Sequence, residues 1–311
     1  MGAPGIEEAA EQYDVIHVNF TTAGLGLIGD LAQACRSTNC KLVVNVDYAV
    51  EMWNTNIHHP TLWLRELDKA DLIFHVEPRG AELLEAALQR PVPVIPHPID
   101  TNGLLAHATK EDERSRTLNC LVHRYDLQVA EPWLLGLGLK KRLPNVTVGV
   151  TLCAEAPPDD MMLRLPYMYD WLRTRQPYAK FVELLSRSWA VYDSYNFSSF
   201  GRTVGECAAL AIPCVGHDCC YAQKALFPKL TFERSSQFRK LETLAMLFES
   251  KEFYKDVAEY AFNGVRNTYS YEASASTMLR ELKMVEISNG NGRVGAGASG
   301  ESEATERVST A

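Results

Sequence analysis

Short, continuous runs of apolar residues alternate along the chain with longer stretches in which apolar residues recur every three or four positions. A continuous run is typical of a parallel strand that is covered on both faces, and the longer period is typical of a helix. In the N-terminal third this pattern predicts strands at 14–20, 41–47, 71–76 and 92–95 and helices at 24–36, 60–69 and 79–89.

The rest of the chain repeats this alternation. It predicts strands at 118–123, 146–152, 189–193 and 212–216 and helices at 131–143, 179–187 and 202–211. From Ser235 to Lys283 the periodicity is helical throughout. The predicted fold class is therefore α/β, with two Rossmann-like parallel-sheet domains that face a crevice.

Domain borders follow from the same pattern. We expect a flexible N-terminus at 1–12, an N-terminal domain at 13–104 and a second domain with terminal helices at 105–285, the two joined near 98–115. The last stretch, 286–311, consists mostly of Gly, Ser, Glu and Asn and has almost no large apolar residue. Such a composition cannot bury a core, so we expect a disordered tail.

The segment Trp189–Gly216, WAVYDSYNFSSFGRTVGECAALAIPCVG, carries the most chemical information. An apolar run ends at Asp193, a polar loop follows, and Gly201 opens a helix. A helix that begins beside a sheet edge presents unpaired N–H groups and a positive dipole end, which suits a phosphate. Glu206 lies one turn into this helix and can reach a sugar hydroxyl.

This segment resembles the C-terminal-domain signature of retaining glycosyltransferases of group 1, which have the GT-B fold and include relatives of sucrose and glycogen synthases. The family pattern is Glu, seven residues, Glu, with Gly-Phe-Gly after the first acid. In this chain Ser198 stands at the first acid, Ser199-Phe200-Gly201 follows it, and Glu206 matches the second acid.

Other segments fall in the order of the same family, so that the resemblance spans most of Tyr13–Val285. These segments are Tyr13–Asn19, Ala70–Val76, Val92–Asp100 and Leu118–Arg124. The family has further strands before the one that Tyr13–Asn19 resembles, whereas about a dozen residues precede it here. The resemblance therefore implies a shortened N-terminal domain.

The resemblance implies transfer of a sugar from a nucleoside-diphosphate sugar, with retention, without a metal and without a cofactor other than this co-substrate. The implied donor-binding residues are Ser198, Ser199, Phe200, Gly201, Arg202, Thr203, Glu206 and Asp218. Glu206 would bind the ribose hydroxyls, because a carboxylate can accept both. The acceptor is not specified.

The candidate catalytic residues are Arg124, Glu206 and His58. Arg124 matches a family arginine that faces the diphosphate. The lysine that accompanies it in the family is absent, and Arg202 is the candidate for the missing charge. The family also places an N-domain histidine near the donor sugar, for which His17, His58, His59 and His75 all qualify by position.

Alternative interpretations remain open. A GT-B protein without catalysis that binds a nucleotide or a partner fits the replacement of the first acid by Ser198. A nucleotide-sugar epimerase would share the fold. Gly24, Gly26 and Gly29 form an isolated GxGxxG pattern, a weak indication of a dinucleotide enzyme. Zinc is a minor option at a short cluster of ligand types: Cys214, His217, Cys219 and Cys220.

Charge and composition limit the binding partners and the cellular location that we expect. The net charge of −8 argues against a broad nucleic-acid surface. No apolar run reaches the ~20 residues of a membrane helix, and the first residues lack the features of a signal peptide. The eight cysteines mostly lie in apolar segments, as reduced thiols do. We therefore expect a cytoplasmic protein.

Overall fold

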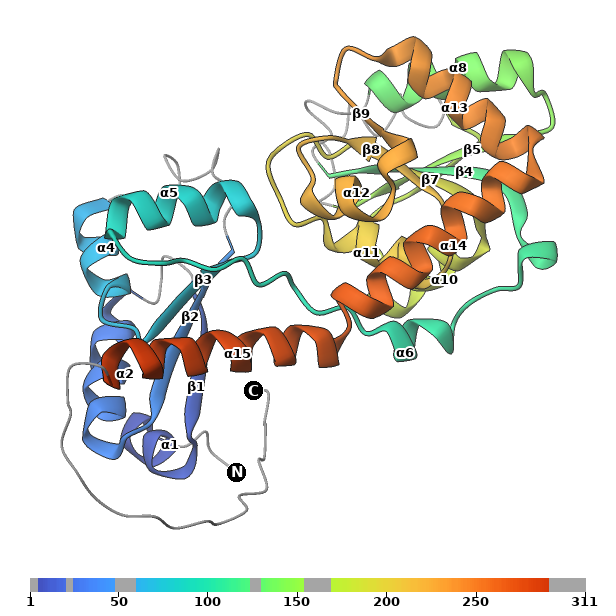
Figure 1. Ribbon diagram of the computed structural model, residues 1–311. Coiled ribbons are helices and arrows are strands. Elements are labelled where there is room, and N and C mark those ends of the chain that lie inside the picture. Colours follow the sequence, from blue (N-terminus) through green and yellow to red (C-terminus); the bar gives the residue numbers. More distant parts are fainter. Residues whose placement is uncertain (1–4, 21–24, 48–59, 124–129, 154–168, 291–311) are drawn as a thin grey trace.

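The computed structural model describes residues 5–20, 25–47, 60–123, 130–153 and 169–290, which form two α/β bodies side by side (Figure 1). The first body contains a sheet of three parallel strands in the order β1-β2-β3. These strands are β1 (Val15–Phe20), β2 (Lys41–Val46) and β3 (Leu72–His75). Its helices are α1 (Ile6–Gln12), α2 (Leu25–Thr38), α4 (Pro60–Leu67) and α5 (Pro78–Leu88).

The second body contains six parallel strands in the order β6-β5-β4-β7-β8-β9. They are β4 (Ser115–Val122), β5 (Thr147–Leu152), β6 (Trp171–Arg173), β7 (Ser188–Asp193), β8 (Cys214–His217) and β9 (Thr231–Phe232). Its α-helices are α6 (Thr101–Leu105), α8 (Ala130–Arg142), α10 (Tyr178–Arg187), α11 (Arg202–Ala209), α12 (Tyr221–Leu226), α13 (Gln237–Glu249) and α14 (Lys251–Thr268). Two 3₁₀ turns, η3 (Glu111–Glu113) and η5 (Pro228–Leu230), complete it.

Each body buries its own apolar core. In the second body the core joins the strands to α8, α10, α11, α13 and α14, and Leu118, Val150, Tyr192 and Val215 have almost no exposed surface. In the first body one face of the sheet packs on α2 and α4, through residues such as Val44, Ile28 and Leu67. The strands β2, β3, β5 and β7 are buried on both faces, as the sequence pattern predicts, whereas the edge strand β1 keeps exposed positions.

The other face of the first sheet is covered by the last helix of the chain, α15 (Tyr271–Gly290). This helix leaves the second body and runs back across the first (Figure 1). Met278 and Leu282 pack against Val43, Leu72 and Phe74. The sequence-based border at residue 285 places this helix with the second domain, whereas its apolar face belongs to the core of the first.

Arg114 helps to fasten the crossing segment, residues 95–114, which lead from the first sheet to β4, to the second body. The Arg114 guanidinium donates to the carbonyl oxygens of Leu210 and Ala211, each at 2.8 Å, and to the Tyr254 hydroxyl at 2.7 Å. Its Nε donates to the Thr109 carbonyl at 3.1 Å. Because the guanidinium group is planar and rigid, these hydrogen bonds fix the position of the crossing segment on the second body.

The predicted α/β class with two parallel sheets is confirmed. Several details differ from the expectations. The predicted disordered tail at 286–311 begins inside α15, which continues to Gly290, and α12 was not predicted. Residues 6–12, expected to be flexible, form α1, which packs on α2. The predicted strand at 92–95 contributes one bridge, from Val94 to His75. The strands β6 and β9 went unpredicted because two or three residues carry no readable period.

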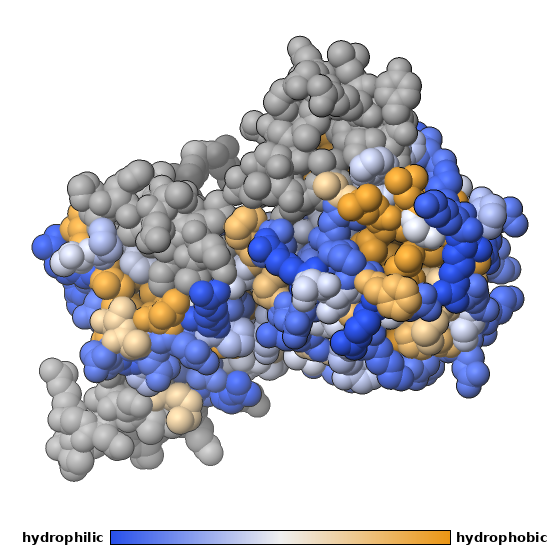
Figure 2. Space-filling model, turned by 90° about the horizontal axis from the view of Figure 1, so that it is seen from above, coloured by the Kyte–Doolittle hydropathy of each residue, from blue (hydrophilic) through white to orange (hydrophobic). Residues whose placement is uncertain are grey.

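Figure 2 looks down on α8 and α13 and shows apolar side chains gathered over the second body. The exposed apolar residues of these two helices are Leu134, Leu137, Phe238 and Met246. No helix in the described part of the chain is long and apolar enough to cross a membrane.

Candidate functional site

The turn from β7 to α11 is built around Gly201. This residue has a φ of 84°, in the left-handed region, and caps the N-terminus of α11. A Cβ atom at this position would collide with the Cys220 sulfur. Only glycine satisfies both constraints. The predicted start of the helix at Gly201-Arg202-Thr203 is confirmed, and the first N–H groups of α11 face the carboxyl end of the sheet.

Glu206 lies one turn into α11 and is 3% exposed. Its Oε1 accepts a hydrogen bond from the Tyr178 hydroxyl at 3.0 Å and lies 3.4 Å from Arg202 Nε. Burial raises the pKa of Glu206 above its ordinary value, against the lowering effects of Tyr178 and of the Arg202 charge. Both contacts engage Oε1 rather than Oε2.

Ser198 is one of the residues through which the two bodies touch. Its hydroxyl accepts a hydrogen bond of 3.1 Å from Arg79 Nη1, and Arg79 lies in the first turn of α5 in the first body. That turn is fixed by Glu77, whose carboxylate accepts from the backbone N–H groups of Arg79 and Gly80 at 3.0 and 2.8 Å. The position that an acid occupies in the resembled family is therefore next to a cation.

The loop after β8 supports the loop after β7. The carbonyl oxygens of Ser199 and Phe200 accept from the N–H groups of Tyr221 and Ala222 at 2.9 and 2.8 Å. Asp218 donates its N–H to the Phe232 carbonyl at 3.1 Å and leaves its side chain exposed. These two loops therefore form one unit at the carboxyl edge of the second sheet.

A buried carboxylate–imidazole pair lies at the same edge. Asp193 Oδ1 is 3.0 Å from His123 Nε2 and also accepts from the Tyr195 N–H at 3.0 Å. Burial acts to raise the pKa of Asp193, but the His123 charge and these hydrogen bonds outweigh it and hold the pKa below its ordinary value. His123 directly precedes Arg124, so this pair fixes the end of β4.

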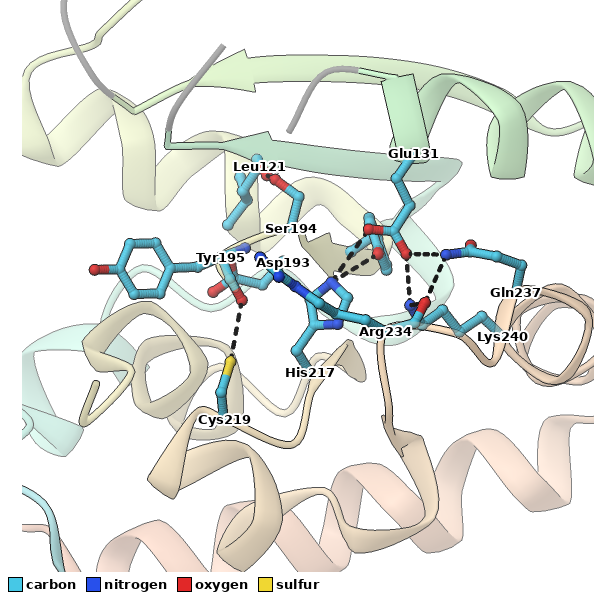
Figure 3. A network of polar contacts seen from close by, with 11 residues as sticks. Leu121, Glu131, Asp193, Ser194, Tyr195, His217, Cys219, Arg234, Gln237 and Lys240 are labelled. Carbon is cyan, nitrogen blue, oxygen red and sulfur yellow. Dashed lines mark hydrogen bonds and ion pairs between the residues drawn. The ribbon is translucent and has the colours of Figure 1, made fainter. Parts of the chain in front are cut away.

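Behind this edge a second polar network joins three elements (Figure 3). Glu131 of α8 accepts from Lys240 Nζ and Gln237 Nε2 of α13 at 2.5 and 2.7 Å, and lies 3.3 Å from Nε2 of His217. Burial acts to raise the pKa of Glu131, but the hydrogen bonds from His217, Lys240 and Gln237 lower it to about 2. Lys240 itself has no exposed surface.

The structure describes only some of the predicted site residues. Arg124 and His58 lie outside the described residues, as does His59. The six residues Ser198–Thr203 lie together on one turn, with Glu206 one helical turn beyond and Asp218 on the adjacent loop. Among the histidines, His75 is fully buried and accepts from the Glu77 N–H at 3.1 Å, whereas His17 is exposed on β1.

Sequence reasoning missed the pair of His123 and Asp193 and also a second carboxylate–imidazole pair. His97 Nε2 lies 2.8 Å from Asp47 Oδ1, and the imidazole packs edge-on to Phe200 with 5.6 Å between ring centroids. His97 belongs to the crossing segment and Asp47 directly follows β2. The only available signal was that both residues follow apolar strands at a carboxyl edge, where ligands of open α/β sheets bind.

A metal site finds no support in this part of the molecule. Among the residues that the structure describes, no group of three or more His, Cys, Asp or Glu side chains is placed to hold a metal ion. Metal independence stays a prediction. The eight cysteines are all free thiols, and burial raises the pKa of Cys219 to about 11.

Comparison with solved structures extends the fold assignment to nearly the whole chain. The chain is similar to an alpha,alpha-trehalose 6-phosphate synthase from Burkholderia multivorans, with a TM-score of 0.67 and 11% identity over 94% of this chain and 76% of that one. It is similar to a sucrose-phosphate synthase from Thermosynechococcus elongatus, with a TM-score of 0.65 and 14% identity over 91% and 77%. For TarM the TM-score is 0.66 with 11% identity, over 86% of this chain and 54% of that one.

At these identities the likeness establishes the fold, which is GT-B. No model of a protein family matches the chain, and no curated protein matches it. The roles of individual residues therefore rest on their geometry.

Proposed function

We propose that this GT-B-fold chain is a glycosyltransferase that takes a sugar from a nucleoside-diphosphate sugar. The observation that carries the proposal is the buried Glu206, held one turn behind the glycine-capped N-terminus of α11 at the carboxyl edge of the second sheet. Solved proteins with this fold include a trehalose-phosphate synthase described as UDP-forming and one bound with UDP-2-fluoro glucose. UDP is therefore the first nucleotide to test.

The donor would lie across the turn from β7 to α11. The diphosphate suits the first N–H groups of α11 and the Arg202 guanidinium, since both supply positive charge there. The ribose hydroxyls suit Glu206 Oε2, because the observed contacts of this carboxylate engage Oε1. Because Glu206 is buried, its carboxylate gains stability from a ligand that donates hydrogen bonds to it; a buried carboxylate without such donors costs free energy.

Retention and metal independence are part of the same proposal. A reaction without a metal needs fixed donors and cations at the departing diphosphate. Arg202 is one such cation, and Arg124 is expected to be another. Retention is measured directly, by the anomeric configuration of the product in NMR spectra.

The first test is thermal melting with UDP, GDP and ADP, their glucose conjugates and NAD. A ligand that binds only the folded chain, at a hundred times its dissociation constant, adds about 2.7 kcal/mol to the free energy of unfolding. We expect a shift with one nucleoside diphosphate and its sugar, and a much smaller one in Glu206→Gln. Glu183→Gln is the matched control, because Glu183 is a carboxylate on α10 that pairs with Lys180 and Arg187 at the surface. A shift with NAD alone contradicts the proposal.

A protein that binds the donor without turning it over is the second candidate. The observation that favours it is the Ser198 hydroxyl bonded to Arg79, where the family has an acid. Release of free nucleotide from the donor, above the level of Glu206→Gln, separates the two functions. Binding without release in any acceptor mixture supports the silent protein.

A further inference from the structure

The strand order of the second sheet singles out one place along its carboxyl edge. β4 lies inside the sheet and pairs with β5 on one side and with β7 on the other. The chain runs outward from β4 through β5 and β6, then returns to β7 and continues outward through β8 and β9. In open parallel sheets, ligands bind outside the carboxyl ends of the strands at such a switch point. A ligand is therefore expected beside the ends of β4 and β7.

Two ionisable side chains occupy this place. Asp193 is the last residue of β7, and His123 directly follows β4. His123 Nε2 lies 3.0 Å from Asp193 Oδ1, so its N–H donates to the carboxylate. Asp193 is 5% exposed, whereas the side chain of His123 is 23% exposed. The acid of the pair is therefore buried, and the imidazole is the member that a ligand can reach.

The imidazole of His123 is held in one orientation. The Tyr195 ring packs edge-on to it with 5.2 Å between ring centroids, and the Tyr195 N–H donates to Asp193. The Ser194 hydroxyl donates to the Leu121 carbonyl at 2.6 Å, which fastens the loop after β7 to the end of β4 (Figure 3). Within the described part of the chain, no group bonds to His123 Nδ1. A carboxylate at one nitrogen and an open second nitrogen is the arrangement found in acid–base histidines.

The pair also favours a positive charge on the imidazole. Burial acts to lower the pKa of His123, but the Asp193 charge and hydrogen bond outweigh it and hold that pKa above its ordinary value. The pKa of Asp193 lies below its ordinary value. Both shifts favour an aspartate beside an imidazolium, whose Nδ1 then carries a proton.

Other ionisable groups surround the pair. They are Cys153 after β5, Glu206 of α11, His217 and Cys219 at the end of β8, and Arg124, which lies outside the described residues. Burial raises the pKa of both thiols, which are therefore neutral near pH 7. Asp193 is the group that bonds directly to the imidazole and sets its charge.

A fixed donor at this place differs from the cation already discussed. The Arg202 side chain is 65% exposed, and its Nε lies 3.4 Å from Glu206 Oε1. A long exposed side chain must be ordered by the ligand, whereas a donor that the fold already holds costs no reorganisation during the reaction. His123 is such a donor, because Asp193 and Tyr195 hold its ring.

We propose that His123 is a catalytic residue of the sugar transfer and that its Nδ1–H donates to the departing diphosphate. The inference rests on the proposed function. The bond from the anomeric carbon to the diphosphate oxygen breaks, and its electron pair passes to that oxygen. The oxygen of an acceptor hydroxyl, or of water, bonds to the anomeric carbon, and the proton of that hydroxyl passes to the diphosphate. The imidazolium stabilises the charge that develops on the leaving oxygen and keeps its own proton.

The experiment measures the rate of nucleotide release as a function of donor concentration and pH. The donor probe is whichever of UDP-glucose, GDP-glucose and ADP-glucose gives the largest thermal shift, with water or glucose as the acceptor. The variants are His123→Ala and Asp193→Asn. His107→Ala is the matched control, because His107 is an exposed histidine of the crossing segment. Thermal melting with and without the donor is recorded for every variant.

We expect His123→Ala to lower the maximal rate about 100-fold, the effect of removing one fixed donor at a developing negative charge, while the donor shift is retained. The wild-type rate should fall as the pH rises through the pKa of His123, because the neutral imidazole keeps its proton toward Asp193. This fall is absent in His123→Ala. It moves to lower pH in Asp193→Asn, since that substitution removes the charge that raises the pKa of His123. Added imidazole should restore part of the rate of His123→Ala.

A merely structural role of the pair would lower the melting temperature without moving the pH profile. The inference is therefore overturned if His123→Ala matches His107→Ala in rate, or if its rate falls while the pH profile stays unchanged. If His123→Ala does not fold, His123→Gln replaces it, since the glutamine amide can still donate to Asp193.

Two further results separate this inference from the proposed function. A donor shift without any nucleotide release by the wild type overturns the catalytic role of His123 and leaves donor binding in place. Absence of any donor shift removes the proposed function itself and this inference with it.

Discussion

At the scale of single residues, the site depends on positions that tolerate one amino acid only. Gly201 combines a left-handed φ of 84° with contact to the Cys220 sulfur. A side chain there would have to strain the backbone and displace the loop after β8 at once. Both the start of α11 and the position of Cys220 therefore depend on the absence of a Cβ atom at residue 201.

We predict that Gly201→Ala lowers the free energy of unfolding by about 1–3 kcal/mol, the range for a residue held in an unfavourable backbone region. It also abolishes the thermal shift with nucleotides. Denaturant titration and thermal melting measure the two effects. Gly5→Ala is the control, because a Cβ at Gly5 meets nothing within 4 Å. A donor shift retained by Gly201→Ala would mean that the α11 turn does not hold the phosphates.

At the scale of elements, α8 and α13 are joined to the end of β8 by charge as well as by apolar packing. The Lys240 ammonium has no exposed surface and is compensated by Glu131. Removing one partner of a buried pair leaves an isolated charge, which costs more than removing both. The network therefore fixes α8 and α13 relative to each other and to the end of β8.

The same network predicts a pH dependence. The pKa of Glu131 is lowered to about 2 from 4.5. A depressed carboxyl pKa adds stability that is fully present above the unfolded-state value and is lost as the pH falls through the folded-state value. The stability advantage of the wild type over Glu131→Gln should therefore be largest above about pH 4.5 and shrink toward pH 2.

Urea titrations at a series of pH values measure this difference. Glu252→Gln, on the exposed first turn of α14, serves as the control for the loss of a surface carboxylate. If the difference in unfolding free energy between the wild type and Glu131→Gln stays the same from pH 4.5 to pH 2, the partners of Glu131 do not stabilise its charged form.

At the scale of the whole molecule, the two bodies share one helix. α15 begins beside the second body, where the Ile99 N–H donates to the Tyr269 carbonyl at 2.7 Å, and ends on the first sheet. Leu282 is 8% exposed between Val43, Leu72 and Phe74. The first body is therefore incomplete without residues that follow the whole of the second.

We predict that Leu282→Asp destabilises the first body by about 2–5 kcal/mol, since it removes buried apolar surface and buries a charge. Met284→Asp is the control, because Met284 is 55% exposed on the same helix. Hydrogen exchange followed by mass spectrometry should show faster exchange in β1, β2 and β3 and unchanged protection in β4 and β7. Equal exchange in both variants would contradict the assignment of α15 to the first core.

The sequence predicted those features that short segments encode. Periodicity located the central strands and most of the helices, and the turn chemistry before Gly201 located the start of α11. It could not predict His97 with Asp47, or Arg79 with Ser198, because each pair joins segments far apart in the chain. Nor could it place α15, since an amphipathic helix does not reveal which of two sheets it covers.

The return of α15 also bears on how the protein is made. Synthesis proceeds from the N-terminus, so β1, β2 and β3 leave the ribosome early, while Leu282 emerges only after the entire second sheet. Until then the face formed by Val43, Leu72 and Phe74 has no cover from its own chain. The core between the first sheet, α2 and α4 contains no residue of α15 and can form early, whereas the opposite face of that sheet is covered last and offers an apolar surface that a chaperone can occupy in the interval.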